Sequence, residues 1–462
     1  MNWTVEQIAG ITRGVLVGRG GVQVQSVSTD TRSLRPGDLF VALRGENFDG
    51  HKFIAQAVSA GAAACVSEER LACCEIPLVV VEDSLRALGD LAANLRKGFD
   101  GPVVAITGTS GKTTTKEMVA AILATTGKGL KTAGNFNNLI GLPLTLFGLK
   151  AEHQWLVLEM GMSRRGEIAR LSEIAAATVG LVTNVGEGHL EELGGIEGVA
   201  RAKGELFAAI QPGGCAVVNC DDARVMQLPV ANGVRRVTYG IGLESLDVSV
   251  TLLQEDSRGS RIELSTEEGR IEIRIEAPGA HQVANAAAAA AVGKALNVPM
   301  GKIARGLESF RPANGRMQPH PLAEEMLLLD DTYNANPLSM RSALETLRNL
   351  ESSDGRFAVL GDMLELGDGA ANLHREIGRY AAGCVDALVA LGEHADDMTR
   401  AAIDAGLSAE RVFVARDHAE AVDKLQTWLQ HGSRILVKGS RGMKMEQACD
   451  LLRERLGNGE AR

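Results

Sequence analysis

The 462-residue chain lacks any apolar run of the ~18–20 residues needed to span a bilayer, so we expect no membrane insertion. The segment from Met1 to Gly10 contains Glu6 and no basic flank before an apolar core, so we expect no signal peptide. Basic residues are outnumbered, 48 Lys+Arg against 58 Asp+Glu, which argues against a nucleic-acid binder that works through bulk positive charge. The seven cysteines form no C-x-x-C pair and no zinc tetrad with histidine, so we expect reduced thiols in a cytoplasmic protein.

Several other signatures are missing. The chain has no G-x-S-x-G motif, no internal repeat and no coiled-coil pattern, and we expect a monomer. Gly18-Arg19-Gly20-Gly21 does not have the G-x-G-x-x-G spacing of a dinucleotide site. Apolar residues are plentiful, at 45% against 23% charged, which excludes a mainly disordered chain. The length indicates about three domains.

Changes in the pattern of strand-like and helix-like segments divide the chain into residues 1–101, 102–312 and 313–462. In the first stretch, helix-like segments at 4–12, 51–60 and 84–99 alternate with short strand-like segments at 38–43 and 78–81, which predicts a small α/β domain.

The second stretch predicts a parallel sheet with crossover helices. Its buried-strand runs are 102–107, 155–158, 178–183 and 215–219, with helix-like segments between them. Residues 270–276 alternate strictly, which indicates a half-exposed antiparallel strand. We expect Asn285 to open an alanine-rich helix.

The third stretch predicts a Rossmann-like, doubly wound α/β domain, because each of its strand-like runs precedes a helix-like segment. The strand-like runs are 326–329, 357–360, 387–391, 411–415 and 434–437. Ligands bind at the carboxyl ends of such strands, where this chain places polar residues at 330–334, 361–363 and 438–441.

The strongest local signal is a glycine-rich turn between the strand at 102–107 and the next helix. Its residues are Gly108, Thr109, Ser110, Gly111, Lys112, Thr113 and Thr114. Glycines let backbone N–H groups converge on phosphate oxygens at a helix N-terminus. In such a P-loop Lys112 lies on the β- and γ-phosphates and the Thr113 hydroxyl on Mg²⁺. Ile106 replaces the first glycine of the general pattern, and a plain strand–turn–helix junction is the alternative.

Three downstream residues are candidates for the same site. Glu159 ends a predicted strand, where it is either a Mg²⁺ ligand or a solvated acid. His189 follows the next strand and is either structural or functional. Lys203 falls on the apolar face of its helix, as a snorkelling side chain or as a desolvated amine that reacts with CO₂ to give a carbamate ligand for Mg²⁺.

Together these residues resemble the Mur ligases, the ATP-dependent, peptide-bond-forming enzymes of bacterial cell-wall precursor synthesis. The match covers nearly the whole chain. Residues 27–32, 38–43 and 49–51 resemble the family's uridine-nucleotide-binding domain, and 134–138 with 141–143 its substrate segment. Residues 281–285 are similar to an H-N-x-x-N motif on the adenine side, with Gln282 in place of an asparagine.

The third stretch is similar to one type of Mur ligase. Residues 331–340, 361–367 and 438–441 resemble the member that joins D-alanyl-D-alanine to UDP-N-acetylmuramoyl-tripeptide. The resemblance implies that ATP activates the tripeptide carboxylate as an acyl phosphate, which the dipeptide amine then attacks, with release of ADP and phosphate.

The resemblance also implies roles for particular residues. ATP is bound by the P-loop together with Asn285, Arg316 and Asp331. One Mg²⁺ is bound by Thr113 and Glu159, and a second by His189 and carbamylated Lys203; the catalytic residues are Lys112, Lys203 and His189. The residues that contact the other substrates are Thr29, Asp30, Thr31, Arg32, Asn135, Asn137, Asn138, Asn334, Asn336 and Arg441.

The alternatives differ in class. The diamino-acid-adding Mur ligase would carry a D-N-P-R motif, which is absent, and the segment 331–337 argues against both it and a folylpolyglutamate synthase. A guanine-nucleotide switch usually has N-K-x-D, which is also absent. A protein that binds nucleotide without catalysis predicts no substrate-dependent phosphate release.

Overall fold

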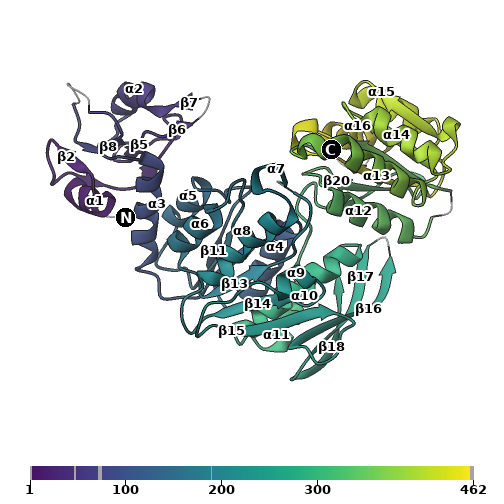
Figure 1. Ribbon diagram of the computed structural model, residues 1–462, viewed down its shortest axis with the longest axis horizontal. Coiled ribbons are helices and arrows are strands. Elements are labelled where there is room, and N and C mark those ends of the chain that lie inside the picture. Colours follow the sequence, from purple (N-terminus) through teal and green to yellow (C-terminus); the bar gives the residue numbers. More distant parts are fainter. Residues whose placement is uncertain are drawn as a thin grey trace.

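Three α/β units follow one another along the chain, with the N-terminal and C-terminal units on opposite sides of the central one (Figure 1). The computed structural model describes residues 3–45, 48–70, 75–188, 190–256, 258–352 and 354–457. Among these residues, no helix is long and apolar enough to cross a membrane.

The N-terminal unit is a small α/β sheet, as predicted. Its elements are β1 (Trp3–Thr4), α1 (Val5–Thr12), β2 (Val15–Val17), β3 (Gln23–Val24), β4 (Val27–Ser28), β5 (Leu39–Val41), β6 (Arg44–Gly45), β7 (Phe48–Asp49), η1 (Gly50–Phe53), α2 (Ile54–Ser59), β8 (Ala64–Ser67), β9 (Leu78–Val80) and α3 (Ser84–Arg96). The main sheet has the order β2-β9-β8-β5-β4 and only β2 is antiparallel.

The helix predicted over 51–60 is divided in two, which corrects that expectation. Its first residues form the 3₁₀ turn η1, in which the Asp49 side chain accepts a hydrogen bond from the His51 N–H. The α-helix α2 starts only at Ile54. Tight packing explains the turn, because a Cβ on Gly50 would lie 2.7 Å from the Leu43 carbonyl oxygen.

The central unit is a nine-stranded sheet of order β11-β12-β10-β13-β14-β15-β16-β17-β18. Its elements are β10 (Val103–Thr107), α4 (Lys112–Ala124), β11 (Gly129–Lys131), α5 (Gly141–Phe147), β12 (Trp155–Glu159), α6 (Glu167–Ala175), β13 (Val179–Val182), α7 (Leu190–Leu193), α8 (Ile196–Ala208), β14 (Cys215–Asn219), α9 (Ala223–Met226), β15 (Arg235–Ile241), β16 (Val248–Asp256), β17 (Gly259–Thr266), β18 (Gly269–Ile275), α10 (Ala280–Ala295) and α11 (Met300–Ser309). The strands are parallel as far as β16, and β17 and β18 are antiparallel, which confirms the alternating strand predicted near 270–276.

Helices cover both faces of the parallel part of this sheet. Along β10, Val103 and Ala105 pack with α5, α6 and α8, whereas Val104 and Ile106 pack with α4, α10 and α11. Successive strand residues point to opposite faces, so an uninterrupted apolar run is what a doubly covered strand needs.

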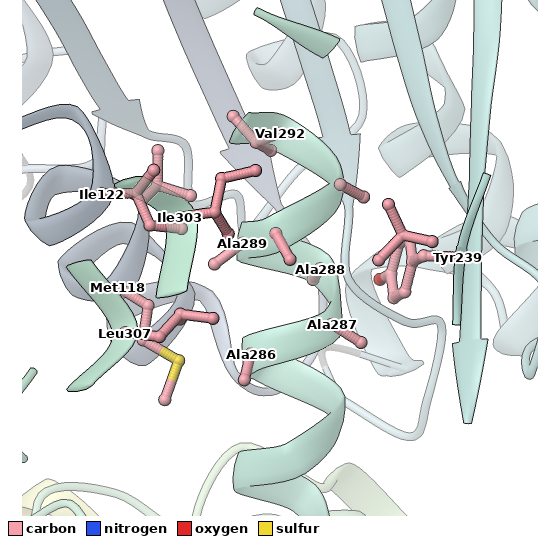
Figure 2. Close-up of a cluster of buried hydrophobic side chains, with 14 of the residues drawn as sticks. Met118, Ile122, Tyr239, Ala286, Ala287, Ala288, Ala289, Val292, Ile303 and Leu307 are labelled. Atoms are coloured by element: carbon pink, nitrogen blue, oxygen red, sulfur yellow. The ribbon is translucent and has the colours of Figure 1, made fainter. Parts of the chain in front are cut away.

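The alanine-rich helix α10 lies in the middle of the second of these cores. Its alanines fit between Met118 and Ile122 of α4 on one side and Tyr239 of β15 on the other (Figure 2). The prediction that Asn285 opens this helix is wrong. The helix begins at Ala280, after Gly279 at φ 111°, and Asn285 lies inside it and is buried. The alanines reflect close packing as well as helix propensity.

The C-terminal unit is a six-stranded sheet of order β19-β20-β24-β21-β22-β23 in which only β19 is antiparallel. Its elements are β19 (Gln318–Pro321), β20 (Leu327–Asp331), α12 (Pro337–Asn349), β21 (Arg356–Gly361), η2 (Gly367–Gly369), α13 (Ala370–Ala382), β22 (Ala387–Leu391), α14 (Ala395–Asp404), η3 (Ala409–Arg411), β23 (Val412–Ala415), α15 (His418–Gln426), β24 (Arg434–Lys438), η4 (Arg441–Met443) and α16 (Glu446–Leu456). Each of the five predicted strands is present and is followed by a helix, which confirms the doubly wound α/β class.

Candidate active site

The glycine-rich turn joins β10 to the N-terminus of α4. The backbone conformation and close neighbours require glycine at two of its positions. Gly108 has φ 149° and Gly111 has φ 82°, values that favour glycine. A Cβ at Gly108 would lie 1.9 Å from Thr183 Oγ1, and one at Gly111 would lie 2.3 Å from Asn285 Oδ1. The backbone therefore approaches its neighbours too closely for any other residue.

The end of the neighbouring strand β13 holds this turn in shape. The Ser110 N–H donates to Asn184 Oδ1 (2.9 Å), and the Ser110 carbonyl accepts from Asn184 Nδ2 (3.1 Å) and Thr183 Oγ1 (2.7 Å). These protein contacts hold the loop in one conformation, which is the preorganisation that a phosphate site needs.

Lys112 folds back on its own loop. Its Nζ donates to the carbonyl oxygens of Gly108 (2.7 Å) and Thr109 (3.4 Å). Burial lowers the pKa of Lys112, Glu159 opposes this shift and the charge of Arg316 adds to it. An incoming phosphate would favour the charged ammonium and give it stronger partners than two carbonyls.

Glu159 is the last residue of β12, beside β10 in the sheet, and it is 2% exposed. Its Oε1 accepts a hydrogen bond from Asn137 Nδ2 at 2.9 Å. Its Oε2 has no hydrogen-bond partner among the residues that the structure describes. The nearest cation among these residues, Lys116 Nζ, lies 3.8 Å from Oε2, too far for a hydrogen bond, so this oxygen keeps its capacity to coordinate and fits a Mg²⁺ ligand.

The hydroxyl of Thr113 accepts a hydrogen bond from Arg316 Nη2 at 2.9 Å. The Arg316 guanidinium carbon lies 3.8 Å from the centre of the Tyr333 ring, and that of Arg441 lies 6.0 Å from the same ring. Arg316 and Arg441 therefore bring positive charge to the side of the turn that faces the C-terminal unit.

Lys203 lies on the buried face of α8 and is 4% exposed, so its amine does not reach bulk solvent. Burial lowers its pKa well below the ordinary value, and the charge of Lys112 lowers it further. A neutral amine is the form that reacts with CO₂. His189, the other candidate for this side of the site, lies outside the described residues.

Asn285 packs against the turn from α10. Its Oδ1 accepts from Thr115 Oγ1 (3.2 Å) and its Nδ2 donates to Gln282 Oε1 (3.1 Å). This amide joins α10 to the P-loop helix directly beneath Gly111.

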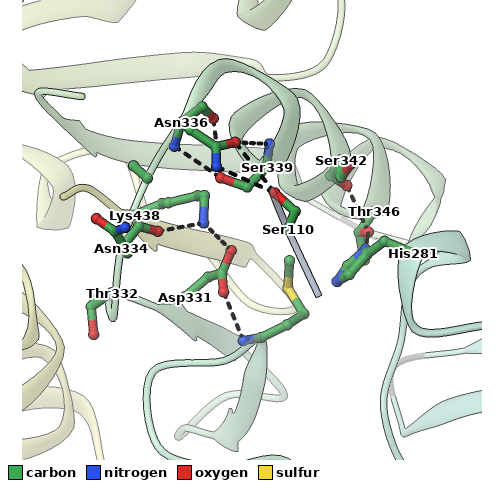
Figure 3. A network of polar contacts seen from close by, with 12 residues as sticks. Ser110, His281, Asp331, Thr332, Asn334, Asn336, Ser339, Ser342, Thr346 and Lys438 are labelled. Carbon is green, nitrogen blue, oxygen red and sulfur yellow. Dashed lines mark hydrogen bonds and ion pairs between the residues drawn. The ribbon is translucent and has the colours of Figure 1, made fainter. Parts of the chain in front are cut away.

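The C-terminal unit approaches the turn with the N-terminus of α12 (Figure 3). Asn336 caps this helix through the Ser339 N–H, and its amide also lies within hydrogen-bond distance of Ser110 Oγ (3.3 Å). Lys438 Nζ pairs with Asp331 Oδ2 (2.5 Å) and donates to the Asn334 carbonyl oxygen (3.0 Å). The structure thus brings Asp331, Asn334 and Asn336 together at the edge of the nucleotide turn.

The remaining predicted substrate residues lie on two other segments. Arg32 binds Asp30 through both carboxylate oxygens (2.9 and 2.6 Å) and lowers the pKa of Asp30 to about 2. Thr29, Asp30, Thr31 and Arg32 belong to the turn after β4 and, within the described residues, form no hydrogen bond or ion pair with the P-loop. Asn138 Oδ1 accepts from the N–H groups of Ile140 and Gly141, whereas Asn135 is exposed.

Sequence reasoning missed four residues that shape this site: Lys116, Thr132, Asn184 and Lys438. Lys116 had a readable signal, since it lies one helical turn after Lys112 on the same helix. Asn184 directly follows a predicted strand and Lys438 belongs to the polar segment 438–441, but their roles could not be assigned without the contacts of their side chains. Thr132 carried no signal.

The turn, the buried carboxylate and the parallel sheet define a P-loop nucleotide-binding protein with a second α/β unit docked on the site. The chain matches the Mur ligase middle domain over residues 106–293, the Mur ligase glutamate ligase domain over 315–441 and the Mur ligase family catalytic domain over 23–96.

Two curated relatives match this chain over nearly their whole length. The chain is 38% identical over 453 residues to UDP-N-acetylmuramoyl-tripeptide–D-alanyl-D-alanine ligase of Escherichia coli (strain K12), covering 98% of each chain. It is 34% identical over 454 residues to the protein of the same name in Bacillus subtilis (strain 168), covering 96% of this chain and 97% of that one.

Solved structures show the same likeness. A crystal structure of MurF from Acinetobacter baumannii has a TM-score of 0.90 at 36% identity, covering 98% of this chain and 99% of that one. MurF ligase from Thermotoga maritima in complex with ADP has a TM-score of 0.83 at 28% identity, covering 93% and 97%. This chain belongs to the Mur ligase family.

Proposed function

We propose that this chain is the ATP-dependent ligase that joins D-alanyl-D-alanine to UDP-N-acetylmuramoyl-tripeptide. The P-loop, with the buried Glu159 beside it, supports a nucleotide-driven reaction, since one oxygen of this carboxylate accepts no hydrogen bond from the described residues. The names of the full-length relatives support the choice of substrates. We place the reaction in the cytoplasm and the protein in a monomeric state, which size-exclusion chromatography with light scattering would test.

The substrates divide among the three parts of the chain. Residues 1–101 hold the uridine diphosphate sugar through Thr29, Asp30, Thr31 and Arg32; residues 102–312 hold ATP; residues 313–462 present the dipeptide through Asn334, Asn336 and Arg441. Asn135, Asn137 and Asn138 lie between the sugar and the nucleotide. The peptide carboxylate must meet the γ-phosphate at the boundary of these parts, and holding three reactants together lowers the entropic cost of the reaction.

The first stage is attack of the tripeptide carboxylate on the γ-phosphate, which forms an acyl phosphate and releases ADP. Both reactants are anions, so their charges must be neutralised before they meet. Lys112 moves from its own loop carbonyls to the phosphates. Arg316 adds a second positive charge, Asp331 contacts the nucleoside, and Asn285 supports the adenine side.

The residues present also fit a divalent cation. Thr113 and Glu159 would hold Mg²⁺ on the triphosphate, and His189 with Lys203 would hold a second ion. When bound, Mg²⁺ neutralises phosphate charge and orients the triphosphate. For Lys203, the neutral amine forms a C–N bond to CO₂ and gives up a proton to water, which would convert the buried amine into a carbamate whose carboxylate could bind the ion. In the second stage, the dipeptide amine attacks the acyl phosphate and phosphate leaves.

The first experiment measures phosphate release from ATP with purified protein, Mg²⁺ and UDP-N-acetylmuramoyl-tripeptide. Parallel reactions contain D-alanyl-D-alanine, free D-alanine, a diamino acid or no amine. Release that depends on D-alanyl-D-alanine supports the proposal. Release with the diamino acid on the dipeptide precursor would move the chain to the sister ligase, and release indifferent to the amine would contradict a ligase.

The role of Lys203 has its own test. Lys203→Ala should abolish phosphate release, and a short carboxylate such as formate should restore part of it by entering the space of the carbamate. Mass spectrometry under CO₂ with a trapping alkylating agent gives an independent readout of the modification. Full activity of Lys203→Ala would overturn this role.

A further inference from the structure

A second lysine of α4 is buried beside the nucleotide turn. Lys116 is 1% exposed, and its Nζ donates to the Thr132 carbonyl oxygen at 2.8 Å. The same Nζ lies 3.2 Å from Glu117 Oε1 and 3.8 Å from Glu159 Oε2. Because a buried ammonium is costly without partners, this position needs a reason beyond packing.

Thr132 links this lysine to the backbone of Glu159. The Thr132 N–H donates to the Val157 carbonyl oxygen (3.0 Å), and its Oγ1 accepts from the Glu159 N–H (3.0 Å). Lys116 holds the carbonyl oxygen of this same residue. The ammonium is therefore connected to Glu159 twice, through Thr132 and directly through charge.

Two different side chains lie close to the two oxygens of the Glu159 carboxylate. Asn137 binds Oε1, while Lys116 attracts Oε2 without a hydrogen bond. Oε2 thus keeps its coordination capacity but not its rotational freedom. Glu117, which is more exposed than Glu159, also pairs with the Lys116 ammonium and with Lys131. The Lys116 ammonium is therefore close to two acids, Glu117 and Glu159.

We propose that Lys116 is a positioning residue that keeps the Glu159 carboxylate turned toward the metal side of the nucleotide site. It touches neither nucleotide nor metal and acts only through Glu159 and Thr132. Two lysines one helical turn apart then have separate tasks: Lys112 binds phosphate, and Lys116 orients the acid opposite it. This role rests on the proposed use of ATP with Mg²⁺.

The test separates positioning from general stability by measuring ADP affinity calorimetrically, with Mg²⁺ and with a chelator. In the wild type, Mg²⁺ should strengthen ADP binding. Lys116→Met should reduce that gain by about tenfold, as expected for a residue that orients a metal ligand, and should leave metal-free binding within about twofold. Lys116→Arg, which keeps the charge, should restore most of the gain.

Lys128→Met is the matched control, because Lys128 is exposed and its ammonium forms an ion pair with Glu152 at the surface. It should leave both affinities unchanged. In steady-state assays, Lys116→Met should raise the Mg²⁺ concentration for half-maximal rate by a similar factor, with an unchanged KM for D-alanyl-D-alanine.

An equal loss of affinity with and without Mg²⁺ would overturn the proposal, because it would mean that Lys116 only supports the fold. So would a Lys116→Met variant with a wild-type gain from Mg²⁺. Should that variant not fold, Lys116→Gln gives the same decision, since its side chain is polar but carries no charge. ADP binding needs no peptide substrate, so a failure of the ligase assay leaves this result readable.

Discussion

The central and C-terminal sheets both place polar residues at the carboxyl ends of parallel strands, but they treat them differently. In the central sheet, Glu159 Oε2 has no hydrogen-bond partner among the described residues, and Lys112 holds only carbonyls of its own loop. In the C-terminal sheet, Asp331 accepts from Lys438 and from the Met317 N–H.

Asp362, at the end of β21, is engaged in the same way as Asp331. It accepts from the N–H groups of Glu393 (2.7 Å) and His394 (3.2 Å). The central strand ends thus keep charge available for a ligand, whereas the C-terminal ones use it to fix loops: Asp362 holds the one that begins α14, and Asp331, through Lys438, the one that contains Asn334. The same strand-end geometry serves chemistry in one unit and positioning in the other.

The largest expected effect is that of Lys112→Met at the central strand ends. Removing the cation that faces the phosphates should lower kcat for phosphate release by about a thousandfold, the upper range for loss of one charge-stabilising group. The variant should keep its unfolding midpoint, which urea titration checks. Lys97→Met, at an exposed position after α3, is the control, and a loss under tenfold at Lys112 would break the comparison.

Next comes Lys438→Met in the C-terminal unit, where stability rather than chemistry should suffer first. The variant leaves Asp331 largely buried without its cation, and the free energy of unfolding should fall by about 3 kcal/mol. Urea denaturation measures it. Arg416→Ala, which removes an exposed ion pair with Glu420, should change the free energy of unfolding far less. Equal losses in the two variants would contradict the buried role of Lys438.

A pH effect should follow from His281, where α10 meets Thr346 of α12 (3.5 Å). Burial lowers its pKa from 6.5 to about 4, opposed by Asp331, while Lys438 lowers it further. The unfolded chain binds the proton first as pH falls below about 6.5, so this contribution to stability is lost between pH 6.5 and pH 4.

Between pH 7 and pH 5, the wild type should therefore lose about 1–2 kcal/mol more unfolding free energy than His281→Gln. Urea midpoints measured at several pH values give the difference. Parallel curves for the two proteins would mean that His281 titrates normally and that the contact between the units is open to solvent.

The smallest effect concerns the link between the two strand-end regions. Asn336→Ala removes the N-cap of α12 and should cost about 1 kcal/mol of unfolding free energy. Combined with Ser110→Ala in a double-mutant cycle, it should show a coupling of about 0.5 kcal/mol. Ser342→Ala, whose hydroxyl bonds within the same helix, is the control and should show no coupling to Ser110. Zero coupling at Asn336 would mean that the units meet without this contact.

Local sequence patterns predicted many of the helices and strands correctly. Buried-strand runs found β10, β12, β13 and β14, and alternation found β18, because these signals depend only on which faces of a strand are covered. The start of α10 was predicted five residues too late, at Asn285 instead of Ala280. Residues 280–284 contain no helix-capping signal, whereas the alanine run after Asn285 has strong helix propensity. The 3₁₀ turn at Gly50 was missed because a contact with Leu43 imposes it.

The sequence by itself determined the α/β class, the phosphate-binding turn and a carboxylate at the end of the adjacent strand. These follow from residue order, since a strand, a glycine turn and a helix are neighbours in the chain. Only the tertiary structure decided that Glu159 keeps one oxygen free, that Lys116 faces it and that Asn336 reaches Ser110. Such contacts join residues far apart in the chain, and their distances depend on how sheets and helices pack, which no local pattern encodes.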